Sequence, residues 1–233
     1  MLNNIYERLL AAQLGKFYSA ILSDFIRSYR KFYSCETALL RLTEDWKCMR
    51  DRGELVAIVS MDLSKAFDVI QHDLLLAKLK AYGVGEGGCA LLKNYLSGRQ
   101  QRLKIGDTFS NWAGTRRGVP EGGVSGPMFF NIFINDLFQH VKYAKLNAYA
   151  DDHQIYSSSL DPLALEECIC QEVNVANQWY KNNSMIVNEK KHQALIQGKT
   201  EHNFSFPVNN SIDIFGMTID NRLFFDNHVS IRK

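Results

Sequence analysis

A short, nearly continuous apolar segment constrains the fold more than any other feature of the sequence. Leu55 to Met61 reads L-V-A-I-V-S-M, which is too short for a helix of its own and has no polar face. Such a run is typical of a central strand that is buried on both faces of a sheet. The chain has 233 residues, of which 46% are hydrophobic, so it is long enough to bury a full core around this strand.

Lys145 to Ser157 carries a second strand pattern, which is interrupted by two adjacent aspartates. Apolar and polar residues alternate around Asp151 and Asp152, and this pattern predicts two short strands joined by a tight turn. Adjacent aspartates form turns readily, so they can serve as an ordinary polar turn. They can equally serve as cation ligands, and the hairpin alone does not decide between these interpretations.

Asp62 directly follows the apolar run and is therefore predicted to lie at the end of the central strand. An acidic residue in this place either caps the next turn or helps to bind a cation. If Asp62 meets Asp151 and Asp152, the cluster has carboxylate oxygens without His or Cys, which favours Mg²⁺ over zinc. Carboxylates from two strands can hold two such ions about 3.5–4 Å apart and stabilise both oxygens of an in-line phosphoryl displacement.

The rest of the chain alternates helical and strand patterns, with no internal repeat, low-complexity tract or linker between independent domains. The predicted helices span residues 2–29 with an interruption near 15, then 37–49, 74–82, 87–96, 128–141 and 163–182. The further predicted strands span 99–105, 109–113, 185–187, 194–196, 202–207 and 212–215.

Two further segments are candidate binding surfaces. Residues 99–113 are predicted to form a hairpin with Arg102 and Lys104 on one face. That basic face suits nucleic acid, but it also suits the protection of an exposed edge against aggregation. Residues 116–127 are the densest Gly/Pro stretch and lead into a helix, whose free N–H groups would favour an anion. This stretch is not a P-loop, because no Gly-Lys-Ser/Thr follows it.

Composition excludes several classes of protein. The five cysteines show neither C-x-x-C pairs nor zinc-site spacing, so we expect reduced thiols in an intracellular protein. No apolar run is long enough for a membrane span, and we expect no membrane partner. The net charge of +2 neither indicates nor excludes nucleic acid. Nuclear or cytoplasmic location and oligomeric state stay open.

The motifs, taken in order, resemble those of reverse transcriptases from non-LTR (LINE-type) retrotransposons over roughly residues 29–229. Any one of these motifs is weak alone, but the ordered set is specific to this family. The matching segments are Val59–Asp68 for the first palm motif, Arg117–Pro127 with Phe130–Leu137 for the next, Tyr149–Asp152 for the polymerase hairpin, and Asn188 with Lys191 and Phe215-Gly216 for the last two.

The resemblance implies an α+β fold: a right-hand polymerase palm, with an antiparallel sheet of four or five strands backed by helices, partial fingers and no thumb. It implies a single reverse transcriptase domain over residues 1–233. Within it, residues 1–54 would be partial fingers and N-terminal helices, 55–220 the palm with a fingers insertion at about 74–117, and 221–233 a truncated start of the thumb connection.

The resemblance also implies roles for individual side chains. Asp62, Asp151 and Asp152 would bind two Mg²⁺ ions, with Mn²⁺ as a substitute, and would be catalytic together with Lys191, the proton donor to pyrophosphate. The residues implied to bind the nucleotide are Lys65, Phe67, Gly122 and Tyr149, and those implied to bind template or primer are Arg30, Arg102, Arg117, Phe215 and Gly216. Because the 2′-hydroxyl distinguishes RNA from DNA precursors, the ring of Phe67 would favour dNTPs. Phe67 as simple core, and Lys65 or Lys191 as solvated surface, remain alternatives.

The function implied is that of an RNA-directed DNA polymerase, which transfers dNMP to a primer 3′-hydroxyl in retrotransposition. Its partners would be an RNA template, a DNA primer or target, and dNTPs. The alternative is a catalytically impaired, nucleic-acid-binding remnant of a retrotransposon. An unrelated Mg²⁺-dependent nuclease is a third class, which is disfavoured because no candidate base or extra acidic cluster stands near Asp62.

Several positions depart from the family pattern. Pro120-Glu121-Gly122-Gly123 stands where Pro-Gln-Gly-Ser is usual, and Ser125 replaces a usual leucine. An ionised glutamate only accepts hydrogen bonds and would repel phosphates, so Glu121→Gln is expected to raise activity or nucleotide affinity. Ser34-Cys35 replaces a Gly-Arg-Ser type of turn. These changes leave the predicted metal ligands intact but are typical of a decaying element copy.

Overall fold

The computed structural model describes residues 2–119, 123–188 and 191–223, and the chain divides into two compact units. The first, here the helical unit, contains Met1–Leu22, Lys65–Ile134 and Asn183–Met185. The second, here the sheet unit, contains Ser23–Ser64, Asn135–Asn182 and Ile186–Lys233. Each unit is therefore assembled from segments that are far apart in the sequence.

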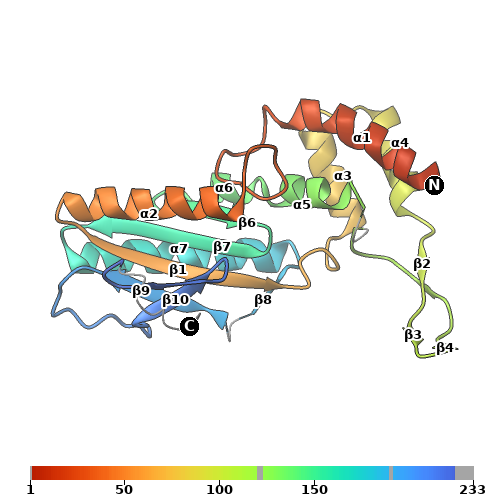
Figure 1. Cartoon of the computed structure of the whole chain (residues 1–233). Coiled ribbons are helices and arrows are strands. Elements are labelled where there is room, and N and C mark those ends of the chain that lie inside the picture. Colours follow the sequence, from red (N-terminus) through yellow and green to blue (C-terminus); the bar gives the residue numbers. More distant parts are fainter. Residues whose placement is uncertain (1, 120–122, 189–190, 224–233) are drawn as a thin grey trace. The chain divides into compact units, whose positions relative to one another are not determined.

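The sheet unit is built on a five-stranded antiparallel sheet in the order β6-β7-β1-β8, with β9 also paired to β1 (Figure 1). The strands are β1 (Leu55–Ser64), β6 (Lys145–Tyr149), β7 (Asp152–Ser159), β8 (Ile186–Val187) and β9 (Gln193–Gln197). β1 has a partner on each side and is the buried central strand that its apolar sequence predicts.

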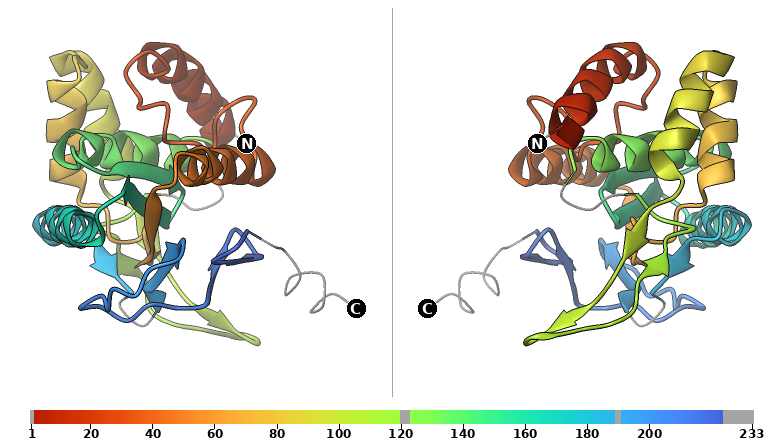
Figure 2. Two further views of the ribbon diagram at one scale, coloured as in Figure 1. Left: turned by 90° about the vertical axis from the view of Figure 1, so that its left-hand side faces the viewer. Right: turned by 90° about the vertical axis from the view of Figure 1, so that its right-hand side faces the viewer.

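Helices cover both faces of this sheet (Figures 1 and 2). α2 (Cys35–Asp51) packs on the face that carries Val56 and Ile58, together with a separate hairpin of β10 (Ser211–Ile214) and β11 (Met217–Asp220). Since side chains alternate along a strand, the opposite face carries Val59, which meets α7 (Pro162–Asn182). The core on the α2 side joins Leu39, Leu42, Trp46, Met49, Val56, Ile58, Tyr156, Leu195, Ile212, Ile214 and Ile219.

The start of α2 is fixed by a reciprocal cap. The Ser34 hydroxyl accepts a hydrogen bond from the Thr37 backbone N–H, and the Thr37 hydroxyl accepts one from the Ser34 N–H. Such a capping box satisfies two otherwise unpaired backbone donors of the first turn. Ser34, a departure from the family pattern, thus has a clear local role in beginning the helix.

The helical unit contains α1 (Leu2–Tyr18), α3 (His72–Ala81), α4 (Glu86–Leu96) and α5 (Gly126–Ile134). α5 is its most buried helix, and the ammonium of Lys78 on α3 donates to the Phe133 carbonyl of α5 over 2.9 Å. An exposed arm, residues 100–114, also belongs to this unit (Figure 1). It consists of β2 (Gln100–Gln101) paired with β5 (Ala113–Gly114), and β3 (Lys104–Ile105) paired with β4 (Thr108–Phe109).

The structure corrects several of the predicted elements. The first helix runs through Gly15 without interruption and ends at Tyr18, well before residue 29. The helix predicted over 128–141 is divided into α5 and α6 (Leu137–His140), because Asn135 turns its side-chain oxygen to the Ser23 backbone N–H, 2.8 Å away. Asn is also a poor residue for a helix interior.

Three differences concern strands. Residues 202–207 form no strand, because Glu166 of α7 accepts the Ser205 N–H and contacts the His202 ring, which holds this segment as a strap. β11 was not predicted at all, and it completes a hairpin with β10 around Phe215-Gly216. Finally, β1 continues past Met61 to Ser64, so Asp62 lies inside the strand and not after it.

Candidate active site

The pairing of β1 with β7 brings the predicted acidic residues to one place in the sheet unit. The register sets Asp62 opposite Asp152, and the Leu63 N–H donates to the Asp151 carbonyl over 3.1 Å. Ala150 turns the chain between β6 and β7 with a φ of 54°. This left-handed conformation is unusual for a residue with a Cβ, but it suits a tight hairpin turn. The three aspartates are thus brought together where the pairing of β1 with β7 ends.

The carboxylates influence one another electrostatically. Burial, and then the charges of Asp151 and Asp62, raise the pKa of Asp152 to about 6, while Lys191 opposes this shift. A carboxyl group that resists ionisation beside two others indicates a site with excess negative charge. Added positive charge would relieve it.

Asp62 has two partners from the segment after β8. The Lys191 ammonium lies 3.2 Å from its Oδ2 and 3.3 Å from its Oδ1, and the Asn188 amide donates to Oδ2 over 3.4 Å. The backbone N–H of Asn188 also donates to the Asp62 carbonyl over 2.8 Å. Asn188 and Lys191, 126 and 129 residues from Asp62 in the chain, are therefore held beside it.

The aspartates have the donor chemistry of a Mg²⁺ site. Within the described part of the chain, no group of three or more His, Cys, Asp or Glu side chains is close enough to hold a metal ion as it stands. The residues nevertheless fit this ion, because the three offer only hard oxygen donors and because their mutual repulsion contributes to the raised pKa of Asp152. In this arrangement Lys191 supplies the positive charge that Asp62 needs.

Three predicted binding residues, Tyr149, Phe215 and Gly216, lie together in the sheet unit. The Tyr149 ring, just before the turn, packs on the Phe215 ring with centroids 5.0 Å apart and planes inclined by 52°. Phe215 and Gly216 both have positive φ values, 53° and 77°, and form the tight turn between β10 and β11. The predicted nucleotide-binding Tyr149 and primer-binding Phe215-Gly216 therefore lie together in the sheet unit.

Arg30 is held by its own segment. Its guanidinium donates to the carbonyls of Ser23 (2.8 Å) and Ile26 (3.1 Å) and lies 5.1 Å from the Tyr33 ring centroid. These bonds fold the segment that runs beside β6, where the Arg27 N–H donates to the Ala148 carbonyl.

The same segment faces the aspartates. Burial, and then the charge of Asp151, raise the pKa of the nearby Tyr29. Tyr29 is thus close enough to Asp151 to be affected by its charge.

The remaining predicted site residues belong to the helical unit. Lys65 is exposed, and Phe67 is half-buried against Phe130 with ring centroids 4.8 Å apart. Arg117 is exposed and pairs with Gln71 through a backbone bridge. Gly122, like Glu121, lies outside the described residues.

Arg102 lies on the arm of the helical unit, between two aromatic rings. Its guanidinium carbon is 4.0 Å from the Phe109 ring centroid and 4.6 Å from that of Trp112.

Comparison with known proteins decides the family. The reverse transcriptase (RNA-dependent DNA polymerase) family matches residues 2–219. The chain belongs to this family. The resemblance to non-LTR retrotransposon reverse transcriptases, expected from the ordered motifs, is confirmed by relatives from such elements.

Two relatives of this reverse transcriptase chain come from Drosophila melanogaster. A probable RNA-directed DNA polymerase from transposon BS is 31% identical over 173 residues, covering 68% of this chain and 18% of the relative. The RNA-directed DNA polymerase from mobile element jockey is 23% identical over 246 residues, covering 98% of this chain and 27% of the relative. The chain thus spans less than a third of the length of either protein.

Solved telomerase structures share the fold of this reverse transcriptase chain. Telomerase from Candida Tropicalis in complex with a TWJ fragment of telomeric RNA has a TM-score of 0.63 at 14% identity, covering 94% of this chain and 36% of that one. The apo enzyme truncated from its C-terminal domain gives 0.60 at 12% identity, covering 86% and 40%. These likenesses confirm the predicted α+β polymerase palm fold.

Two side chains that support the turn beside the aspartates were not predicted. His153 is fully buried behind the turn, with Nε2 3.1 Å from the Ala150 carbonyl and Nδ1 2.7 Å from the Tyr180 hydroxyl. Burial lowers its pKa to about 4, so the ring is neutral near pH 7. A carbonyl only accepts, so Nε2 carries the proton and Nδ1 accepts a hydrogen bond from Tyr180. These two hydrogen bonds connect the turn at Ala150 to α7.

Cys35 is the second. A hydrogen bond with its side chain, followed by burial, raises the pKa of Tyr149 to about 12 and keeps the phenol protonated. Cys35 is one of five free cysteines, as the sequence predicted. Its departure from the usual fingers turn was the available signal, but nothing in the sequence pointed to Tyr149 as its partner.

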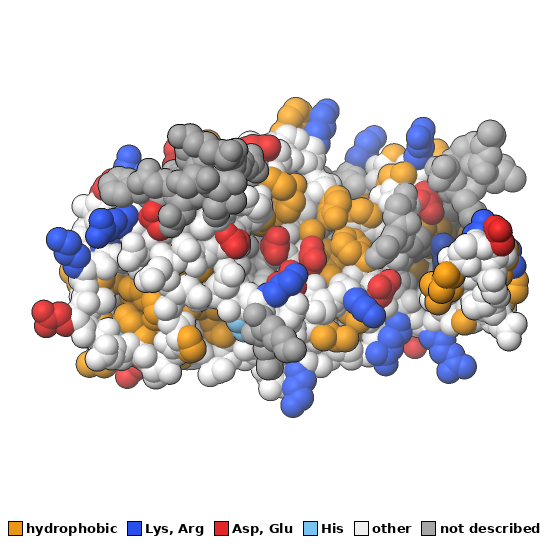
Figure 3. All heavy atoms as spheres, turned by 60° about the horizontal axis from the view of Figure 1, so that its bottom comes forward, with side chains coloured by type: hydrophobic (Ala, Val, Ile, Leu, Met, Phe, Trp, Pro, Cys, Tyr) orange, Lys and Arg blue, Asp and Glu red, His pale blue; other side chains and the backbone are white. Residues whose placement is uncertain are grey.

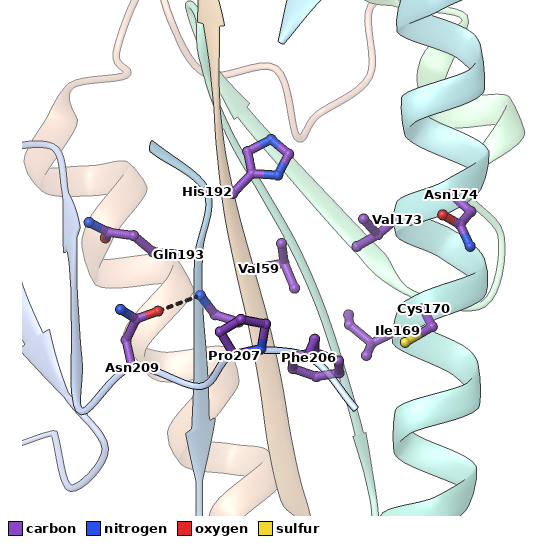
Figure 4. A pocket seen from close by; sticks show the side chains of 11 residues that line it. Val59, Ile169, Cys170, Val173, Asn174, His192, Gln193, Phe206, Pro207 and Asn209 are labelled. Carbon is purple, nitrogen blue, oxygen red and sulfur yellow. Dashed lines mark hydrogen bonds between the residues drawn. The ribbon is translucent and has the colours of Figure 1, made fainter. Parts of the chain in front are cut away.

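A cavity of about 480 Å³ lies elsewhere in the sheet unit, between α7, β9 and the strap (Figure 4). Apolar side chains of Val59, Ile169, Val173 and Phe206 dominate its wall, and the Asn209 side chain accepts the Ala194 backbone N–H over 3.1 Å. By strand alternation Val59 and Asp62 point to opposite faces of the sheet, so this cavity is not part of the aspartate site.

No described helix is long and apolar enough to cross a membrane.

Proposed function

We propose that this chain carries the catalytic palm of an RNA-directed DNA polymerase, which transfers dNMP to a primer 3′-hydroxyl on an RNA template. The observation that carries the proposal is the meeting of Asp62, Asp151 and Asp152 at the paired ends of β1 and β7, with Lys191 on Asp62. In the reaction, the primer oxygen bonds to the α-phosphorus as the bond to pyrophosphate breaks. The primer hydroxyl loses its proton and pyrophosphate gains one.

The three aspartates would hold two Mg²⁺ ions, or Mn²⁺ as a substitute, with Asp62 and Asp151 as principal ligands and Asp152 assisting. When bound, the ions would stabilise the attacking and leaving oxygens of the displacement. Lys191 and a cation compete for the same oxygens of Asp62. Displacement of Lys191 from Asp62 would free its ammonium to donate a proton to pyrophosphate.

The nucleotide would be bound by Lys65, Phe67, Gly122 and Tyr149. The packing of Phe67 on Phe130 supports a selective role, because a ring that is backed by the core can exclude a 2′-hydroxyl without yielding. The alternative, that Phe67 only fills the core, agrees less well with the partial exposure of its side chain. Template and primer would contact Arg117, Arg102 and the Phe215-Gly216 turn, whose ring lies on Tyr149.

Arg30 supports template binding in a different way from direct contact. Its donors to the Ser23 and Ile26 carbonyls hold the segment that presents Tyr29 and Tyr33. We therefore assign Arg30 the ordering of a template-facing segment, and expect its loss to weaken template binding by disordering that segment.

The arm adds a nucleic-acid surface to this proposal. Arg102 and Lys104 lie beside Phe109, and Trp112 is 59% exposed, which is the mixture of cations and rings that binds unpaired strands. On the face shown in Figure 3, basic side chains lie among acidic ones and no single charge dominates. With a net charge of +2, binding would rest on such local clusters.

Primer extension on an RNA template with dNTPs and Mg²⁺ tests the proposal. We expect extension by the parent chain and a loss of about 100-fold or more in Asp151→Asn, which removes one charge with little change of shape. Asp161→Asn, at the start of α7, is the matched control and should extend like the parent. Template affinity is measured in parallel by fluorescence anisotropy.

The second candidate is a nucleic-acid-binding remnant without catalysis. It is favoured by two observations: Lys191 neutralises Asp62, and among the described residues no group of three or more His, Cys, Asp or Glu side chains is close enough to hold a metal ion. If the parent binds template but does not extend the primer with Mg²⁺ or Mn²⁺, the polymerase proposal is wrong for this chain and the remnant is right.

A further inference from the structure

Glu7 of α1 is a buried acid that the proposed reaction does not use. It is only 5% exposed, and each of its oxygens has a partner within the helical unit. The Tyr95 hydroxyl of α4 donates to Oε1 over 2.7 Å, and the Val124 backbone N–H donates to Oε2 over 2.9 Å. A buried carboxylate is costly unless it is hydrogen-bonded in this way, so the arrangement is specific.

Ser125 completes a chain of hydrogen bonds. It is fully buried, and its Oγ lies 3.0 Å from the Tyr95 hydroxyl. Because Tyr95 gives its only proton to Glu7, the Ser125 hydroxyl is the donor to Tyr95. Burial raises the pKa of Tyr95, and the Glu7 contact adds to the shift. A leucine at position 125 could not take part in this chain.

Gly123 is fitted to the same carboxylate. A Cβ at this position would lie 2.7 Å from Glu7 Oε2 and 3.3 Å from both Cδ and Oε1. Real Cβ atoms do not approach oxygen so closely, so the end of the Glu7 side chain would have to shift, which would disturb its hydrogen bonds with Tyr95 and Val124. Glycine at this position therefore lets Glu7 keep both of its hydrogen-bond partners.

We propose that Glu7 is a positioning residue that clamps Gly123–Ser125, the end of the glycine-rich stretch, at the start of α5. Gly123 and Ser125 are matched to Glu7 and are not marks of decay. The clamp is a feature of this chain's own residues, since both positions depart from the usual motif.

The clamp bears on nucleotide selection, and this part rests on the proposed polymerase function. It fixes the start of α5, and α5 carries Phe130, on which the ring of Phe67 packs. The Phe67 carbonyl in turn accepts the Val119 N–H over 2.9 Å, just before the glycine-rich stretch. Loosening the clamp therefore moves the support of the ring that would exclude ribonucleotides, and leaves the aspartates unchanged.

A double-mutant cycle on the full 233-residue chain tests the clamp. Gly123→Ser forces a Cβ against the carboxylate and should lower the melting temperature by about 3–10 °C. Glu7→Ala removes the carboxylate, so Glu7→Ala/Gly123→Ser should be more stable than the two single losses predict. Glu7→Gln, which still accepts the Val124 N–H, should retain part of the stability. Glu86→Gln, a change at an exposed acid of α4, is the control.

Kinetics separate positioning from simple packing. Gly123→Ser should lower kcat/KM for dNTPs by roughly 10- to 100-fold and reduce the preference for dNTPs over rNTPs, with the Mg²⁺ dependence unchanged. Glu7→Ala/Gly123→Ser should recover part of both. Additive melting shifts, or an unchanged nucleotide preference in a destabilised Gly123→Ser, would overturn the proposal. If the parent does not polymerise, the polymerase proposal fails, while the coupling in melting temperature still decides whether Glu7 clamps this segment.

Discussion

Lys191 and Asp62 form an ion pair. In the proposed function, a bound cation would compete with the Lys191 ammonium for the carboxylate of Asp62. The ammonium neutralises Asp62 and is itself well exposed, with 63% of its side chain accessible. An exposed ion pair of this kind contributes little to the free energy of unfolding. Its proposed role begins when Lys191 separates from Asp62. The proposed reaction needs both a cation on Asp62 and a free proton donor.

Lys191→Met tests this competition. Without the ammonium, a cation no longer has to displace a rival from Asp62, so half-saturation by Mg²⁺ should occur at a lower concentration. The maximal extension rate should nevertheless fall by about 10²-fold, because the proton donor to pyrophosphate is lost.

Magnesium titrations of primer extension provide the measurement, and Lys181→Met at the exposed end of α7 provides the control. A variant that needs more Mg²⁺ than the parent would show that Lys191 assists cation binding, contrary to the competition.

At the scale of elements, the strap of residues 202–207 shows how a local pattern misleads. Its alternating sequence predicts a strand. Instead, the Glu166 carboxylate accepts a hydrogen bond from the Ser205 N–H over 2.6 Å and contacts the His202 ring. The bonds from Ser205, and then from His202, lower the pKa of Glu166 to about 2. The strap is thus fastened by one ionised side chain of a helix that precedes it by some distance in the chain.

This fastening predicts a pH dependence. The pKa of Glu166 is lower when folded than its ordinary value of 4.5, so its contribution is complete above pH 4.5 and is lost as the pH falls toward 2. Hydrogen exchange of the Ser205 amide should therefore be protected at pH 7 and should lose protection, relative to β10, as the pH is lowered from 4.5 toward 2. In Glu166→Gln the protection should be weaker and should no longer change over this range. Protection in the parent that does not depend on pH would contradict the fastening.

The arm predicts a separable effect on template binding. Stacking of one base on Trp112 is worth about 1–3 kcal/mol, so Trp112→Ala should weaken binding of an unpaired RNA strand by roughly 5- to 100-fold. Leu103→Ala, at a residue of the same arm that is 70% exposed and does not stack with Arg102, is the matched control. Fluorescence anisotropy measures both, and equal losses in the two variants would indicate general damage to the arm.

A feature could be predicted from the sequence when the residues that determine it are neighbours in the chain. β1 was predictable because a short, nearly continuous apolar run is typical of a buried central strand. The aspartates were predictable because the first palm motif and the polymerase hairpin contain them. The break at Asn135 was not, because its partner Ser23 lies 112 residues away. The roles of Glu7 and His153 were not predicted for the same reason: each contacts residues that lie far from it in the chain.

At the scale of the whole molecule, each unit has its own share of the proposed function. The three aspartates, Lys191 and the Phe215-Gly216 turn belong to the sheet unit, whereas Phe67 and the glycine-rich stretch belong to the helical unit. Cation binding and nucleotide selection are therefore assigned to different structural bodies.

This division predicts where Mg²⁺ acts. Millimolar Mg²⁺ should slow hydrogen exchange at the ends of β1 and β7 and leave α3 and α4 unchanged, because ligand binding stabilises the part that holds the ligand. Asp62→Asn should abolish the protection. Protection spread equally over both units, or retained in Asp62→Asn, would place the ion elsewhere.

The antiparallel register between β1 and β7 has a consequence for how this chain tolerates change. Residue pairs run without a gap from Leu55–Ser159 to Asp62–Asp152, so the meeting of the aspartates is fixed by counting along two strands. A slip of one position would turn the side chains of a strand to the other face and separate Asp152 from Asp62. Substitutions in these strands can be absorbed one at a time, whereas the insertion or deletion of a single codon within them would dismantle the site at once.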